Sequence, residues 1–198
     1  MKISFLASHG GSSAKAIIKA MNDGEVNAQP GVIITNNRDS AIYQWCKEND
    51  FPVFHISSVT HSGAGAEDAA IRDTLLQSNT DVVVCSGYMK KIGPDTLNAF
   101  NGKILNIHPA LLPNHGGKGL YGDKVHESVL DAGEIESGAT VHIVDAEYDR
   151  GPILGRSRVR VDASDTVATL RANVQATEPG LYIECLSRFL KTIPDSES

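Results

Sequence analysis

Short apolar runs alternate with longer amphipathic stretches along most of the chain. Continuous apolar runs of four to eight residues are typical of strands that are covered on both faces. Runs of this kind predict strands over residues 3–7, 32–35, 51–56, 81–85 and 103–107. Helical spacing of apolar positions predicts helices over residues 12–21, 40–49, 67–77 and 124–132, with Ser12 or Ser13 as the N-cap of the first.

The last third of the chain has a different pattern. Two more apolar stretches predict strands over residues 139–145 and 153–161, and the second of them alternates between apolar and polar positions. Residues 164–190 have helical spacing, which Pro179-Gly180 interrupts. Because a proline inside a helix costs about 3 kcal/mol or more, we expect a kink there.

The regular alternation of strands and helices predicts the fold class. It indicates an α/β fold with a mostly parallel twisted sheet, an antiparallel extension and helices on both faces. We expect one domain over residues 1–193 and a flexible tail over residues 194–198. In such sheets ligands bind beyond the carboxyl ends of the strands, so the loops after the strands are the candidate sites.

Composition excludes several classes of protein. The chain has 198 residues, a net charge of −6, 41% hydrophobic residues and 21% charged residues, which together exclude disorder and a bulk nucleic-acid binder. Three widely spaced cysteines form neither a disulfide framework nor a zinc site, so we expect a reducing, cytoplasmic compartment and no metal. No apolar run approaches the roughly 18 residues of a membrane span.

The loop after the first predicted strand is a candidate anion site. Residues 8–13 (SHGGSS) follow a strand and open a helix, where free amides and the helix dipole favour a negative charge. The Gly-Gly pair is neither GxGxxG nor a P-loop, so a single phosphate fits better than a dinucleotide. A tight turn with a serine cap explains the same residues equally well.

The fifth predicted strand ends in Asn106-Ile107-His108-Pro109. The side-chain period of two places Asn106 and His108 on the same side of the strand. An asparagine amide can donate to a developing oxyanion, and a histidine can move a proton near neutral pH. This pair suits acyl or formyl transfer to an amine, although a hydrogen-bonded asparagine and a packed histidine at a strand end are the simpler interpretation.

Two further loops carry candidate polar groups. Asp149 lies in a turn between two predicted strands, and Asp145 and Glu147 are alternative carboxylates in the same loop. His142 is expected to be a core residue of the preceding strand. The loop over residues 87–94 ends in a helix-starting proline, and its backbone and lysines could contact a flat heterocycle with carboxylates.

Three strings together resemble the folate-dependent formyltransferases. They are NIHPALLP at residues 106–113, HxVxxxxDxGP at residues 142–152 and GYMKKI at residues 87–92. The resemblance runs from residue 1 to about residue 190. It is greatest to members that formylate glycinamide ribonucleotide. It implies a Rossmann-like fold and transfer from 10-formyltetrahydrofolate in de novo purine biosynthesis.

The resemblance also implies roles for individual residues. Asn106, His108 and Asp149 would be catalytic, with Asn106 and His108 at the formyl oxygen and Asp149 tuning His108 and helping to move the amine proton. Gly11, Ser12 and Ser13 would hold the substrate phosphate, and Glu178 would contact the glycinamide ribonucleotide. The folate would be bound by Met89, Lys90, Ile92, Asn106 and Val144.

Some positions depart from the family pattern. Ser13 stands where asparagine is common, Lys91 where the residue is often apolar, and the loop over residues 114–122 carries extra residues. Two-domain relatives are disfavoured, because 198 residues leave no room for a second domain. The alternatives are a formyltransferase for another amine, such as an amino sugar nucleotide, and a non-catalytic nucleotide-binding module. The expected partners are small molecules, without nucleic acid or membrane, for a monomer or homodimer.

Overall fold

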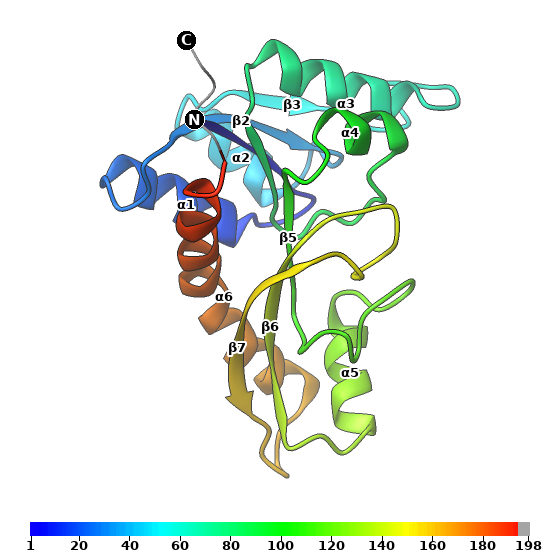
Figure 1. The fold of residues 1–198 in the computed structure, drawn as a ribbon. Helices are drawn as coiled ribbons and strands as arrows, with labels where there is room; N and C mark the ends of the chain where they lie inside the picture. The colour runs from blue at the N-terminus through cyan, green and yellow to red at the C-terminus, as the bar shows by residue number, and fades with distance from the viewer. Residues whose placement is uncertain (194–198) are drawn as a thin grey trace. The chain divides into compact units, whose positions relative to one another are not determined.

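The computed structural model describes residues 1–193 and confirms the α/β fold expected from the sequence (Figure 1). Within these residues the strands form one seven-stranded sheet in the order β3-β2-β1-β4-β5-β6-β7, with helices on both faces. The chain divides into two compact units, Met1–Leu105 and Asn106–Ser198. The expected single domain stays a prediction, and the expected tail at residues 194–198 lies outside the described residues.

The first unit is a parallel sheet with β1 between β2 and β4. Its strands are β1 (Lys2–Leu6), β2 (Gln29–Thr35), β3 (Val53–His55) and β4 (Val82–Cys85). Its helices are α1 (Ser12–Asn22), α2 (Ala41–Glu48), α3 (Ala66–Gln77) and α4 (Pro94–Ala99). Burial of the whole of β4, and of β1 from Ile3 to Leu6, explains the continuous apolar runs seen in the sequence.

The second unit continues from β5 (Ile104–His108), whose last three residues belong to it. Its other elements are α5 (Asp123–Asp131), β6 (Glu136–Ile143), β7 (Ile153–Arg160) and α6 (Val167–Leu190). β6 and β7 pair antiparallel, and α6 packs against both (Figure 1). Gly155 allows this close packing, because a Cβ atom there would lie 2.5 Å from Sγ of Cys185.

The N-terminus of α1 differs from the prediction. Its N-cap is Gly11, and neither Ser12 nor Ser13 provides a side-chain cap. Gly11 has φ 58°, and a Cβ atom there would lie 2.7 Å from Cδ1 of Ile42, so only glycine fits without displacement. A glycine cap leaves the amides of the first helical turn without an acceptor from the cap residue.

The bounds of some strands and helices also differ from the predicted ones, where the local hydrophobic pattern is weak. β2 begins at Gln29 and β6 at Glu136, each three residues before the predicted start. In β6 the extension includes Gly138, where a Cβ atom would lie 1.9 Å from the carbonyl oxygen of Ser157 on β7. α4 has only six residues, too few to show helical spacing, and the Asp68 carboxylate accepts from the amides of its first turn.

The predicted interruption of the last helix is wrong. α6 is assigned as one helix of 24 residues with Pro179 inside it. Apolar side chains are buried on both sides of the proline, including Leu170, Val174 and Leu186. Burying one such side chain contributes about 1.5–3 kcal/mol, so several of them offset the cost of the proline. No helix among residues 1–193 combines the length and apolar character that a membrane crossing requires.

One polar group is buried within α5 without compensation. His126 is 1% exposed, and its Nδ1 has no hydrogen-bond partner among the described residues. Burial lowers the pKa of His126, the charge of Asp123 acts in the opposite direction, and Arg171 and His108 lower it further. The folded protein therefore resists protonation of this imidazole.

We predict that the free energy of unfolding falls as the pH drops below about 6.5, the ordinary pKa of histidine. The unfolded chain then binds protons that the folded chain excludes at His126, so the stability present above this pH is progressively lost. Urea unfolding from pH 5 to pH 8 measures the effect. His126→Leu should flatten the slope in part, and an unchanged slope would contradict the prediction.

Candidate functional site

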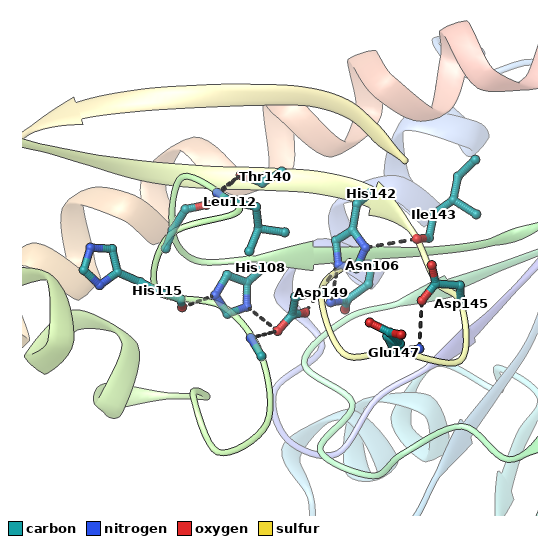
Figure 2. A network of polar contacts seen from close by, with 12 residues as sticks. Asn106, His108, Leu112, His115, Thr140, His142, Ile143, Asp145, Glu147 and Asp149 are labelled. Atoms are coloured by element: carbon teal, nitrogen blue, oxygen red, sulfur yellow. Dashed lines mark hydrogen bonds and ion pairs between the residues drawn. The ribbon is translucent and has the colours of Figure 1, made fainter. Parts of the chain in front are cut away.

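Asn106 and His108 lie at the carboxyl end of β5, as expected from the sequence (Figure 2). The neighbouring apolar residues Ile104, Leu105 and Ile107 are buried and fix the strand in the core. Asn106 is half-buried and His108 is 4% exposed. The two side chains are thus held in a polar cluster at the end of an otherwise apolar strand.

Both ring nitrogens of His108 face acceptor groups. Nε2 lies 2.8 Å from the carbonyl oxygen of His115, which can only accept, so Nε2 carries a proton. Nδ1 lies 3.6 Å from Oδ2 of Asp149. The surroundings of the ring therefore match the protonated imidazolium, which has a donor on each side.

His142 joins Asn106 to Asp149. Its Nδ1–H donates to the carbonyl of Ile143 at 3.1 Å, so in the neutral ring Nε2 accepts from Nδ2 of Asn106 at 3.2 Å. The same Nε2 lies 3.5 Å from Oδ1 of Asp149, which it would face as a donor if the ring were protonated. His142 is 2% exposed, in keeping with the expected core position, but it also connects the polar cluster.

Burial and neighbouring charges have opposite effects on the pKa values of His108 and Asp149. Burial lowers the pKa of His108, the charge of Asp149 and the carbonyl of His115 raise it, and the net pKa lies below the usual value. Burial acts to raise the pKa of Asp149, but the contact with His142, the charge of His108 and the hydrogen bond from the Gly117 amide outweigh it. Asp149 is therefore ionised at neutral pH, beside an imidazole that resists protonation.

Asp149 is the carboxylate that meets the histidines. It has φ 57°, in the left-handed region that aspartate tolerates, and its Oδ2 accepts from the amide of Gly117 at 2.9 Å. The rival carboxylates Asp145 and Glu147 are exposed, and Asp145 instead accepts from the amide of Glu147 within its own loop (Figure 2). The sequence left open which of these three carboxylates meets the histidines, and in the structure it is Asp149.

The turn after β5 is held by the two antiparallel strands. The Thr140 hydroxyl on β6 donates to the carbonyl of Ala110 at 2.6 Å and accepts from the amide of Leu112 at 3.1 Å. The Arg156 guanidinium on β7 donates to the carbonyl of Leu112. A Cβ atom at Gly116 would lie 2.3 Å from Cδ2 of Leu112, so a larger residue there would displace the Leu112 side chain.

The loop after β1 belongs to the first unit and has the features of an anion site. The amide of Ala14 donates to the Ser86 hydroxyl, whereas the amides of Ser12 and Ser13 have no acceptor among the described residues. Ser12 is exposed, Ser13 is buried, and the first turn of α1 carries no acidic residue. Free amides at the positive end of a helix suit a phosphate.

The loop after β4 lies beside it in the same unit. The Ser8 hydroxyl donates to Oδ1 of Asn36 at 2.6 Å and accepts from the amide of Met89 at 2.9 Å, which ties the two loops together. Met89 and Lys90 are exposed, and Ile92 is buried. Two of the three residues of this loop that are expected to contact a folate are thus at the surface.

The other expected binding residues lie in the second unit. Val144 is half-buried directly after β6, in the loop that carries Asp149. Glu178 is half-buried on α6, and burial raises its pKa. Within residues 1–193 it has neither a hydrogen bond nor an ion pair. The structure therefore groups Asn106, His108 and Asp149 through His142, and leaves Glu178 apart from that network.

Two residues of the cluster were missed from the sequence. His115 and Gly117 contact His108 and Asp149 through backbone atoms, which no residue type reveals. The only signal was the glycine-rich composition of the loop over residues 114–122. No group of three or more His, Cys, Asp and Glu residues suited to a metal ion occurs among residues 1–193.

Known proteins resemble the chain over almost its full length. Phosphoribosylglycinamide formyltransferase of Arabidopsis thaliana, a chloroplastic protein, is 40% identical over 92% of this chain, and that of Haemophilus influenzae is 33% identical over 91%. The chain spans 63% of the length of the Arabidopsis relative, 59% of that of Vigna unguiculata and 83% of that of Haemophilus.

Solved structures agree with this similarity. Glycinamide ribonucleotide transformylase 1 of Symbiobacterium toebii superposes with a TM-score of 0.90 at 30% identity, covering 96% of this chain and 88% of that one. Phosphoribosylglycinamide formyltransferase of Bacillus halodurans superposes with a TM-score of 0.88 at 31% identity, covering 97% of this chain and 96% of that one. Residues 1–186 match the formyl transferase family, and the chain therefore belongs to that family.

Proposed function

We propose that this chain transfers a formyl group from 10-formyltetrahydrofolate to the primary amine of glycinamide ribonucleotide. The products are formylglycinamide ribonucleotide and tetrahydrofolate, in de novo purine biosynthesis. The observation that carries the proposal is the cluster of Asn106, His108 and Asp149 at the end of β5, in a member of the formyl transferase family. The names of the relatives from Arabidopsis and Haemophilus support this acceptor.

The reaction joins the amine nitrogen to the formyl carbon and breaks the bond from that carbon to N10 of the folate. Overall, one amine proton is lost and N10 gains one. The uncharged amine attacks, and negative charge develops on the formyl oxygen. We assign Asn106 to that oxygen, because its amide has a second N–H beyond the one given to His142.

His108 is proposed as the acid at the same oxygen. Its Nε2 already holds a proton, and the charge of Asp149 favours the imidazolium that burial disfavours. Asp149 also has the charge needed to accept the amine proton through water. Under this proposal, the reaction uses the two substrates, these side chains and a water molecule.

The binding roles rest on local features of each loop. We assign Gly11, Ser12 and Ser13 to the substrate phosphate, because their backbone offers free amides at a helix start without acidic neighbours. We assign Glu178 to the rest of the acceptor. The folate is assigned to Met89, Lys90, Ile92, Asn106 and Val144.

We further propose a cytoplasmic protein, monomeric or homodimeric, that binds neither nucleic acid nor membranes. The net charge of −6 supports the absence of nucleic-acid binding. The three cysteines are buried and form no disulfide among residues 1–193, and burial raises the pKa of Cys46 to about 11 and that of Cys85 to about 12. Such thiols are unreactive, which fits a reducing compartment.

A formyl-transfer assay tests the function directly. Purified protein and 10-formyltetrahydrofolate are incubated with glycinamide ribonucleotide or with an amino sugar nucleotide, and tetrahydrofolate release is followed. We expect turnover only with glycinamide ribonucleotide. Turnover only with the amino sugar would replace the acceptor, and ligand binding without turnover of either would favour a non-catalytic binding module.

We predict that His108→Ala and Asp149→Asn each lower kcat by about 10²–10⁴-fold, the usual contribution of acid–base groups. Steady-state kinetics measure kcat, and circular dichroism checks the fold. Asp145→Asn is the matched control, because this carboxylate lies in the same loop but does not contact the histidines. Wild-type rates in both variants would remove these residues from the mechanism.

Ser12→Asp separates phosphate binding from helix stability. A carboxylate at the first position of α1 stabilises the helix by about 0.3–1 kcal/mol through its dipole. The same charge repels a bound phosphate, so we expect KM for glycinamide ribonucleotide to rise about tenfold or more. The Tm of Ser12→Asp should stay the same or increase. The uncharged control variant Ser12→Asn should change KM much less. An unchanged KM in Ser12→Asp would place the phosphate elsewhere.

A further inference from the structure

Residues 115–117 contact both members of the His108–Asp149 pair. The carbonyl of His115 accepts from Nε2 of His108, and the amide of Gly117 donates to Oδ2 of Asp149. One short backbone segment therefore holds the imidazole and the carboxylate at the same time. Its position determines the geometry of the pair as much as the two side chains do.

The side chain of His115 is held by two residues that do not touch the pair. Its Nδ1 lies 2.8 Å from the Ser128 hydroxyl on α5, and its Nε2 lies 3.3 Å from Oε1 of Glu134, just after that helix. One neutral tautomer satisfies both contacts, with Ser128 donating to Nδ1 and Nε2–H donating to Glu134. The His115 ring is 12% exposed and the Glu134 side chain is 41% exposed, so water reaches the contact from the side of Glu134.

The backbone at His115 needs such support. His115 has φ 54°, a conformation that costs a non-glycine residue about 1–2 kcal/mol, and two glycines follow it. Neither glycine adds a side chain that could fix the segment. The contacts with Ser128 and Glu134 are therefore the side-chain contacts that hold the backbone at His115, in addition to the bond from the Gly117 amide to Asp149.

We propose that His115 is a positioning residue, which Ser128 and Glu134 hold so that its carbonyl fixes the imidazole of His108 and the proton on Nε2. The catalytic consequence rests on the proposed formyl transfer, whereas the effect on His108 does not. Without this support, His108 loses an acceptor that stabilises its protonated ring.

Other titratable groups also face His108 and affect the expected shift in its pKa. Asp149 lies in the loop after β6, His142 on β6 and His126 on α5, and each affects the charge of His108 or is affected by it. None of them is changed by substitution of Ser128 or Glu134. The charge of the His115 ring also lowers the pKa of His108, and Glu134 faces that ring. A shift in the pKa of His108 therefore reports the hold on the His115 carbonyl only where Glu134→Gln does not reproduce it.

The test is a titration of the His108 ring by NMR in the whole protein without substrate. We compare wild type, Ser128→Ala, Glu134→Gln and Ser128→Ala/Glu134→Ala. In the double variant we expect the pKa of His108 to fall by about half a unit, a roughly threefold change in its protonation constant. Glu134→Gln keeps an oxygen acceptor for His115 and should stay close to wild type.

Two outcomes would overturn the proposal. One is an unchanged pKa of His108 in a folded double variant, or in Ser128→Ala if the double variant does not fold. The other is an equal shift in Glu134→Gln, which would assign the effect to the charge of Glu134. Glu136→Gln removes an exposed carboxylate two residues away, paired with Arg158, and is the matched control.

Kinetics separate this proposal from the proposed function. If formyl transfer occurs, the double variant should lower kcat about three- to tenfold while both KM values stay within about twofold, since the substituted residues bind neither substrate. A change in KM alone would count against positioning. If wild type shows no transfer at all, the proposed function fails while the NMR titration still decides the role of His115.

Discussion

A buried imidazole keeps a defined orientation and proton only when each ring nitrogen faces a suitable partner, and the second unit meets this requirement at His108. The carbonyl of His115 faces one nitrogen and the carboxylate of Asp149 faces the other. Both partners come from loops, so both loops must be fixed by the strands beside them. The contacts of Thr140 and Arg156 to the turn after β5 serve this purpose.

The regular elements were predictable because burial leaves a pattern in the residues themselves. DVVVC and KILNI are apolar throughout, and the structure places them in β4 and β5. Asn106 and His108 were recognisable for a related reason, because polar residues stand out at the end of an apolar strand. The α/β fold and the family followed from these features and from the strings around them.

The remaining features depend on contacts between distant parts of the sequence. The cap of α4 comes from Asp68, 27 residues before the first amide it binds. Pro179 is tolerated because the buried face of α6 continues past it. His115 and Gly117 act through backbone atoms, so their residue types carry no signal. Choosing Asp149 over Asp145 and Glu147 required the positions of His108 and His142.

Ser8 links three loops of the first unit through its hydrogen bonds. Its hydroxyl donates to Asn36, after β2, and accepts from Met89, after β4, while its own amide donates to the carbonyl of Gly87. Local opening of any one of these loops exposes the Met89 amide to solvent or leaves the hydroxyl with a single partner. Hydrogen exchange at that one amide thus reports whether these three loops are closed together.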